Sequence, residues 1–168
     1  MKSTYLGLGT NLGERENNLK EAIAMIGESI GRIVASSPVY ETEPWGFKSE
    51  SQFLNMVVQA ETKLGPSGLL RSILMIEANL GRLRDQKKYS SRTIDIDILM
   101  YDKQIINRAS LVIPHPMLQE RRFVLVPLCE IAPDVVHPVM KKTFVTLLRE
   151  CKDTSKVVIY NNPLSAKL

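Results

Sequence analysis

The spacing of the apolar residues changes several times along this chain, and these changes restrict the fold more than any other feature of the sequence. A short apolar run from Tyr5 to Gly9 predicts a strand that ends in a turn. An amphipathic helix follows, because apolar residues recur three and four positions apart and Gly31 is placed to end it. This stripe comprises Leu19, Ala22, Ile23, Ile26 and Ile30. Residues 32–40 then predict a second strand.

The middle of the chain repeats this order after residues 41–52, which have no periodicity and are expected to form a long loop. Alternating side chains over residues 53–63 predict a third strand. Pro66 suits the first turn of a second helix, and residues 94–101 alternate again as a fourth strand. The resulting order is β-α-β-β-α-β, so the sequence predicts an α+β fold with a ferredoxin-like core and an antiparallel sheet.

The residues from about 103 onward read as an extension of this core. Residues 104–106 and 111–113 predict a small hairpin, residues 117–130 one or two short helices, and residues 144–151 another helix. The extension is too short to bury a core of its own, so we expect it to pack against one side of the sheet. With 168 residues in all, the chain is predicted to be a single domain over residues 1–168.

Composition excludes several classes of protein. No apolar run approaches the roughly 18 residues of a membrane span, and the first residues lack a secretion signal, so we expect a cytoplasmic protein with no membrane partner. Cys129 and Cys151 are too few for a disulfide framework and are interpreted as unreactive packing residues. The net charge of +4 suits a small anionic ligand as well as a nucleic acid.

Asp95 and Asp97 are the most informative polar residues, because residues two apart on a strand project from the same face roughly 7 Å apart. Two such carboxylates repel each other unless a cation lies between them, and Mg²⁺ prefers carboxylate and phosphate oxygens. The alternative is an ordinary solvated sheet face. The neighbouring arginines, which favour phosphoryl transfer over that alternative, are Arg82, Arg84 and Arg92.

The sequence lacks the motifs of other nucleotide-binding folds and of nucleic-acid-binding sheets. There is no phosphate-binding loop with the GxxxxGK[ST] pattern, and Gly7-Leu8-Gly9 lacks the third glycine of a dinucleotide fingerprint. An RNA-binding sheet would need exposed aromatic residues for base stacking, whereas aromatics are only 6% of the residues and no RNP-like motif occurs. We therefore expect no nucleic-acid partner.

Several motifs occur together in an order that resembles the 6-hydroxymethyl-7,8-dihydropterin pyrophosphokinase family. They are GLGTNLG at 7–13, YETEPWG at 40–46, FLN at 53–55, Glu77 with Gly81-Arg82, RTIDIDIL at 92–99, PHP at 114–116 and RRF at 121–123. The resemblance implies an ATP-dependent diphosphotransferase of folate biosynthesis. Such an enzyme transfers diphosphate from ATP to the hydroxymethyl group of 6-hydroxymethyl-7,8-dihydropterin, giving AMP and the dihydropterin diphosphate, with two Mg²⁺ ions.

The resemblance also implies residue roles. The catalytic residues would be Arg82, Arg92, Asp95 and Asp97, of which Asp95 and Asp97 would hold both metal ions. ATP would be bound by Leu70, Glu77, Arg82, Arg84, Arg92, Ile98, His115 and Arg121. The pterin would be bound by Thr42, Pro44, Trp45, Phe53, Asn55 and Phe123, with its ring between the two phenylalanines. Both substrates are small molecules, and we expect a monomer.

Each role has a structural alternative. Phe53 and Phe123 could be ordinary core residues, and Asn55 could satisfy a backbone group. His115 could be structural, and Glu77 could lie at the surface or pair with an arginine. A pterin-binding or regulatory protein without catalysis is the alternative function, and it would need neither the acidic pair nor the arginines.

Residues 83–91, between the second helix and the fourth strand, carry three basic side chains and no apolar face that would anchor them. We expect this segment to act as a lid that closes over the triphosphate and excludes water. Shortening it while Arg82 and Arg92 are kept should slow the chemical step far more than it weakens substrate binding. Single-turnover kinetics beside equilibrium titrations would separate the two effects. A variant that loses affinity but keeps its single-turnover rate would show that the segment only contacts the substrates and does not act as a lid.

Overall fold

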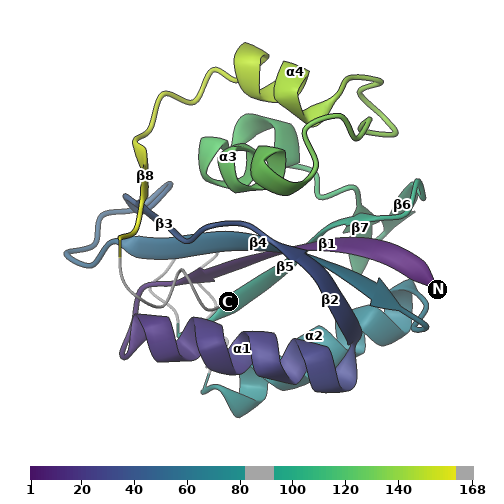
Figure 1. Ribbon diagram of the computed structural model, residues 1–168, viewed down its shortest axis with the longest axis horizontal. Coiled ribbons are helices and arrows are strands. Elements are labelled where there is room, and N and C mark those ends of the chain that lie inside the picture. Colours follow the sequence, from purple (N-terminus) through teal and green to yellow (C-terminus); the bar gives the residue numbers. More distant parts are fainter. Residues whose placement is uncertain (82–92, 162–168) are drawn as a thin grey trace.

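The computed structural model describes residues 1–81 and 93–161, and it shows one sheet with helices on both faces (Figure 1). The strands of this sheet are β1 (Lys2–Thr10), β2 (Gly31–Ser36), β3 (Tyr40–Thr42), β4 (Phe53–Thr62), β5 (Asp95–Tyr101) and β8 (Val157–Ile159). The helices are α1 (Arg15–Ser29), α2 (Pro66–Asn79), α3 (Arg122–Ile131) and α4 (Phe144–Glu150). A hairpin of β6 (Ile106–Arg108) and β7 (Leu111–Ile113) and the 3₁₀ helix Leu118–Glu120 precede α3.

The strands lie in the order β5-β1-β4-β3-β8, with β2 pairing with β4 beside β3. Every pairing between these strands is antiparallel. The prediction of an α+β fold with an antiparallel sheet is therefore confirmed. The strand β5 lies at one edge of the sheet, and β1 pairs with both β5 and β4.

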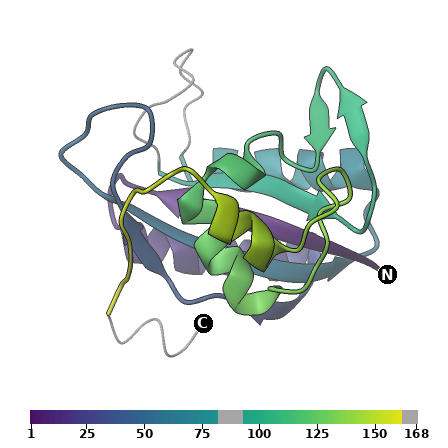
Figure 2. The same cartoon turned by 90° about the horizontal axis from the view of Figure 1, so that it is seen from above.

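The sheet separates two hydrophobic cores because successive side chains of a strand point to opposite faces. On one face, Leu6 and Leu8 of β1 are buried with apolar residues of α1 and α2. On the other face, Tyr5 and Leu99 are buried with Leu125 of α3 and other residues of the C-terminal extension. The helices α3 and α4 thus pack against one side of the sheet, as the sequence predicts for the extension (Figures 1 and 2). The hairpin departs from that expectation, because Ile113 is buried in the core on the opposite face.

The single strand predicted for residues 32–40 is wrong, because β2 ends at Ser36 and β3 begins at Tyr40. Pro38 lies between them and has no N–H for a ladder hydrogen bond. Ser37 replaces the ladder locally: its N–H donates to the carbonyl of Val57 (2.9 Å), and its Oγ accepts the N–H of Val57 (3.0 Å). Residues 41 and 42 belong to β3, so the loop expected at 41–52 is shorter and spans residues 43–52.

The short elements depart most from the sequence expectation. The first strand of the hairpin lies at Ile106–Arg108 instead of residues 104–106. The strand β8 was not predicted at all, although it pairs with β3 along its full length of three residues. The three residues of β8 are too few to show a periodicity, and only their pairing with β3 identifies them as a strand.

No helix in the described ranges 1–81 and 93–161 is long and apolar enough to cross a membrane.

Burial makes Cys129 a poor nucleophile, and this can be measured. Desolvation, with a smaller effect of the neighbouring Glu130 charge, raises the pKa of the Cys129 thiol to about 11. Since the thiolate is the reactive form, little of it exists at pH 8. We expect iodoacetamide to alkylate Cys129 at pH 8 at least about ten-fold more slowly in the folded protein than in urea, as followed by peptide mass spectrometry. Equal rates in both states would contradict the raised pKa of this partly buried thiol.

Candidate active site

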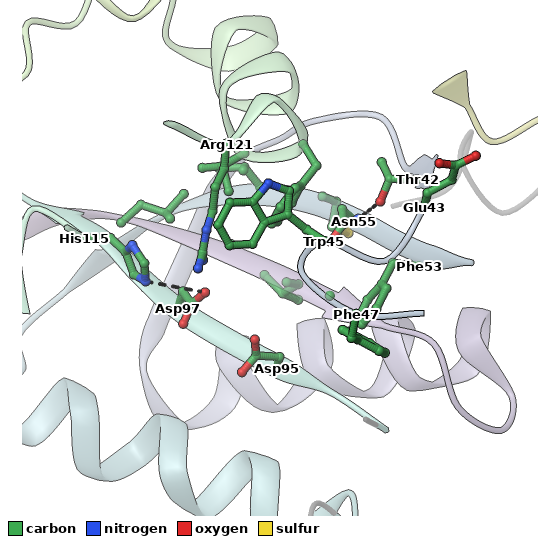
Figure 3. A pocket seen from close by; sticks show the side chains of 18 residues that line it. Thr42, Glu43, Trp45, Phe47, Phe53, Asn55, Asp95, Asp97, His115 and Arg121 are labelled. Carbon is green, nitrogen blue, oxygen red and sulfur yellow. Dashed lines mark hydrogen bonds and ion pairs between the residues drawn. The ribbon is translucent and has the colours of Figure 1, made fainter. Parts of the chain in front are cut away.

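A cavity of about 270 Å³ lies on the sheet face that carries α3, where loop 43–52 approaches the start of that helix (Figure 3). Its walls come from β1, β3, β4, β5, the loop and residues 115–124. The sequence-predicted residues that line it are Thr42, Trp45, Phe53, Asn55, Asp95, Asp97, His115, Arg121 and Phe123. Residues that are far apart in the chain are thus brought to one site.

The floor of the cavity is set by two glycines of the central strand β1. Gly9 pairs with Asn55 of β4 on one side and with Asp95 of β5 on the other. Gly7 pairs in the same way with Val57 and Asp97. Paired residues share a face of the sheet, so each glycine leaves a hollow between its two neighbours. The hollow at Gly9 is needed, because a Cβ there would lie 2.9 Å from Oδ1 of Asn55.

The two carboxylates form one wall of the cavity. Asp95 and Asp97 both point into it from β5, and both are partly exposed (Figure 3). Ile96 between them points to the opposite face, into the core against α1 and α2. The structure therefore places the acidic pair on one face of the strand, as the alternation predicts.

Glu77 holds the backbone of β5 between these carboxylates. Its side chain on α2 is 3% exposed, and its Oε1 accepts the N–H of Ile96 at 2.8 Å. A carboxylate is a strong acceptor for a backbone N–H, so this bond fixes the strand at the acidic pair. The surface location considered for Glu77 is wrong, and the side chain does not line the cavity. Its predicted contact with ATP stays a prediction.

His115 faces the acidic pair as a neutral hydrogen-bond donor. Burial and then the charge of Arg121 lower the pKa of His115 to about 4, although Asp95 opposes the shift. Its Nδ1 accepts the N–H of Met117 (3.1 Å), so Nε2 carries the proton. Nε2 lies 3.9 Å from Oδ2 of Asp97, and because the ring is neutral this contact is not an ion pair. The arrangement leaves an N–H aimed at the carboxylates.

Aromatic rings and Arg121 form the opposite wall. The guanidinium of Arg121 lies 4.9 Å from the ring centre of Trp45 and 5.8 Å from that of Phe123. Phe53 is packed edge-on against Phe47, with ring centres 6.0 Å apart. These contacts hold flat apolar surfaces beside a cation. The Nε of Arg121 is buried and has no hydrogen-bond partner among the described residues.

Asn55 is oriented by Thr42. Its Nδ2 donates to Oγ1 of Thr42 at 2.6 Å, and both residues are buried. The bond comes from the β3–β4 pairing, which sets Thr42 opposite Phe53. An amide held in this way presents a donor and an acceptor in fixed directions, which suits the edge of a polar heterocycle.

Other predicted residues lie elsewhere. Pro44 is next to the cavity in sequence but is not among the residues that line it. Ile98 lies in the core on the opposite face, and Leu70 is partly buried against that core. Arg82, Arg84 and Arg92, and the lid predicted at residues 83–91, lie outside the residues that the structure describes.

Sequence reasoning missed several residues that line the cavity, among them Gly7, Gly9 and Phe47. The glycines had a readable signal, since two residues spaced two apart on a strand share a face. Phe47 had none, because the loop gives no periodicity that would show which of its side chains turn inward.

Within residues 1–81 and 93–161 there is no group of three or more His, Cys, Asp or Glu that could hold a metal by itself. A cation at this site would take ligands from Asp95 and Asp97 and the rest from a bound molecule. The fold and the pocket thus define a small α+β protein whose cavity has carboxylates at one end and aromatic rings beside a guanidinium at the other.

The model of the family described as 7,8-dihydro-6-hydroxymethylpterin-pyrophosphokinase matches residues 5–133. A 2-amino-4-hydroxy-6-hydroxymethyldihydropteridine pyrophosphokinase of Methylorubrum extorquens is 46% identical over 137 residues, which cover 81% of this chain and 86% of the relative. The enzyme of the same name from Aquifex aeolicus is 42% identical over 142 residues, covering 84% of this chain and 88% of the relative. The chain belongs to the 7,8-dihydro-6-hydroxymethylpterin-pyrophosphokinase family. It is an enzyme that transfers pyrophosphate from ATP to hydroxymethyldihydropterin in folate biosynthesis.

Solved structures agree on the fold. A crystal structure of an HPPK-DHPS protein in complex with substrates superposes with a TM-score of 0.72 at 16% identity, covering 89% of this chain and 43% of that chain. The Plasmodium falciparum HPPK-DHPS wild type gives a TM-score of 0.71 at 18% identity, with the same coverage of 89% and 43%. This chain therefore spans less than half the length of those larger proteins.

Trp45 is the only tryptophan, and it reports on the cavity that it lines. We expect its fluorescence to change when a pterin analogue binds in the presence of an ATP analogue, because a ligand would alter its contact with Arg121. ADP-ribose or RNA should change it little. A Trp45→Phe variant, which removes the signal, is the control for ligand absorbance. An unchanged spectrum with every pterin tested would place Trp45 away from the bound ring.

Proposed function

We propose that this cavity carries the diphosphate transfer, with the pterin bound at its aromatic end and the ATP phosphates at its acidic end. The observation that supports this is the register of β1, which sets Asn55 and Asp95 on either side of Gly9. In the reaction the hydroxymethyl oxygen bonds to the β-phosphorus of ATP and loses its proton. The bond from that phosphorus to the oxygen of the α-phosphate breaks, and AMP leaves.

We propose that Asp95 and Asp97 are the protein ligands of two Mg²⁺ ions. Their carboxylate oxygens are hard donors, and two of them with substrate phosphates match the usual Mg²⁺ environment. The bound ions would neutralise phosphate charge as it shifts toward the leaving group. The task of the chain is to keep the two carboxylates in place, and the hydrogen bond from Ile96 to Glu77 supports that role.

The pterin end is proposed to consist of Thr42, Pro44, Trp45, Phe53, Asn55 and Phe123. Phe53 and Phe123 line the cavity from β4 and from the first turn of α3, and they would take the ring between them. Asn55 would hydrogen-bond its edge, because Thr42 holds the amide in one orientation. Such preorganisation lowers the cost of binding.

On the phosphate side we propose His115 and Arg121 as ligands of ATP. The neutral His115 offers its Nε2–H, and Arg121 offers a charged, planar set of donors that suits phosphate. Arg82, Arg84 and Arg92 are proposed for the same phosphates on the resemblance in sequence alone. Leu70, Glu77 and Ile98 are proposed near the nucleotide on the resemblance in sequence as well.

We also propose that the core is ferredoxin-like and that one pyrophosphokinase domain spans residues 1–168. The ferredoxin-like core is supported by the element order β1-α1-β2-β4-α2-β5 and by the sheet order β5-β1-β4. In this comparison β3 continues β2, because both strands pair with β4. The single domain is supported by Phe144 and Leu147, which lie beyond the family match but belong to the core under α3. A monomer in the cytoplasm, without nucleic-acid or membrane partners, remains our proposal from the sequence.

Removing either carboxylate should abolish turnover without unfolding the protein. We expect Asp95→Ala or Asp97→Ala to lower kcat by at least about 1,000-fold, since metal-held charge contributes several kcal/mol at the transition state. Asp134→Asn, an exposed carboxylate in the loop after α3, is the matched control and should retain activity. The assay is ATP turnover with Mg²⁺ and 6-hydroxymethyl-7,8-dihydropterin, with AMP resolved from ADP.

Three outcomes of that assay would overturn the proposal. Near-normal turnover by either alanine variant would remove the carboxylates from the reaction. Formation of ADP in place of AMP by the unmodified protein would show a simple kinase. Turnover of neither kind, with the pterin still bound, would indicate the binding protein without catalysis.

A further inference from the structure

We infer that Arg15 is a positioning residue for the pterin end of the active site, although it does not line the cavity. The inference rests on the proposed function, and it assigns to the first residue of α1 the task of clamping the base of loop 43–52, by tying its last residue, Gln52, to Glu41 of β3. That loop carries Glu43, Trp45 and Phe47 into the cavity. Where the base of the loop is held therefore decides where these side chains lie.

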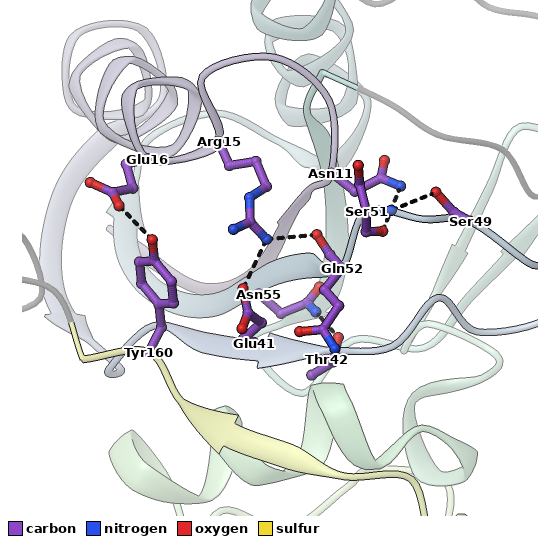
Figure 4. Close-up of polar contacts among 10 residues, drawn as sticks. All are labelled: Asn11, Arg15, Glu16, Glu41, Thr42, Ser49, Ser51, Gln52, Asn55 and Tyr160. Atoms are coloured by element: carbon purple, nitrogen blue, oxygen red, sulfur yellow. Dashed lines mark hydrogen bonds and ion pairs between the residues drawn. The ribbon is translucent and has the colours of Figure 1, made fainter.

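One nitrogen of Arg15 makes both contacts (Figure 4). Its Nη1 donates to Oε2 of Glu41 at 3.0 Å and to the carbonyl of Gln52 at 2.8 Å. Glu41 lies in β3 just before the loop, and Gln52 is the last residue before β4. The β3–β4 ladder pairs Glu41 with Leu54 and Thr42 with Phe53, so the guanidinium ties Gln52, the residue just beyond the ladder, to β3.

The C-terminal segment holds Arg15 in place. The ring of Tyr160 lies 5.8 Å from Cζ of Arg15, and its hydroxyl donates to Oε1 of Glu16 at 2.6 Å. The N–H of Tyr160 donates to the carbonyl of Val39 at 2.8 Å, next to the β3–β8 pairing. Tyr160 thus links the start of α1 to the edge of the sheet. Through Tyr160, the segment that follows strand β8 thus contacts Arg15.

The position of the ion pair makes it stronger than an ordinary surface pair. The side chains of Arg15 and Glu41 are 26% and 31% exposed, whereas those of Arg32 and Glu61, which pair between β2 and β4, are 72% and 35% exposed. Fully exposed pairs contribute little, because water screens them and long side chains must be ordered. Arg15 is less exposed, and it makes a second hydrogen bond to a carbonyl.

A residue that positions the loop and a residue that only stabilises the fold should affect the binding of the two substrates differently. If it positions the loop, its loss should weaken pterin binding while ATP binding, which depends on β5 and residues 115–121, changes little. We expect Arg15→Ala to raise the KM for the pterin by about ten-fold, the equivalent of about one charge-assisted hydrogen bond. The KM for ATP should change far less.

The experiment compares Arg15→Ala, Arg15→Lys and the control Arg32→Ala in the full chain. Acrylamide quenching and anisotropy of Trp45 are measured without substrates, and then both KM values. In Arg15→Ala the tryptophan should become more accessible and more mobile, and the pterin KM should rise. Arg15→Lys, which keeps the charge but not the fork of donors, should lie between wild type and Arg15→Ala. Arg32→Ala should match wild type in all readouts.

The outcomes separate the clamp from the proposed function. If Trp45 quenching and the pterin KM in Arg15→Ala equal those of Arg32→Ala, the clamp is wrong. Equal increases of both KM values would make Arg15 a general structural residue and would also overturn it. If Arg15→Ala does not fold, Arg15→Lys decides by the same readouts. Should wild type fail to turn over a pterin, the proposed function fails, while the tryptophan measurements still test the clamp.

Discussion

The register of β1 between β4 and β5 is the constraint on which the rest of the site depends. Because antiparallel neighbours share a face, Gly9 sets Asn55 and Asp95 two strands apart on one side of the sheet. A slip of one residue would turn both side chains into the opposite core. That register is secured by Leu6 and Leu8, which must remain buried against the helices. Hydrophobic burial on one face thus fixes the chemistry on the other.

The second core then closes the cavity from above. α3 packs over the sheet through Val124, Leu125 and Leu128, and this places Phe123 in its first turn at the cavity. The start of the helix is held by Asp153, whose Oδ2 accepts the N–H of Arg122 at 2.9 Å. Segments from both halves of the chain are therefore needed to bring one aromatic ring opposite another.

The sequence is sufficient to predict the helices and strands that are long enough to show a regular spacing of apolar residues. Alternation over residues 94–101 correctly put Asp95 and Asp97 on one face, and helical stripes located α1 and α2. It was insufficient where a few residues depend on a distant partner. Strand β8 exists only because β3 offers an edge, and the contact of Arg15 with Gln52 joins residues far apart in the chain. No local pattern encodes such contacts.

The net charge of the site also cannot be read from the sequence, because it depends on which side chains are buried and which lie side by side. In sequence, His115 looks like a possible cation beside two carboxylates, yet burial and the nearby Arg121 lower its pKa to about 4 and keep the ring neutral. It therefore contributes a directed N–H and no positive charge at physiological pH. Repulsion between Asp95 and Asp97 must then be balanced by other positive charge, and the guanidinium of Arg121 lines the same cavity. In the proposed function, cations that arrive with the substrate phosphates would supply the rest, and metal binding would then depend on substrate binding.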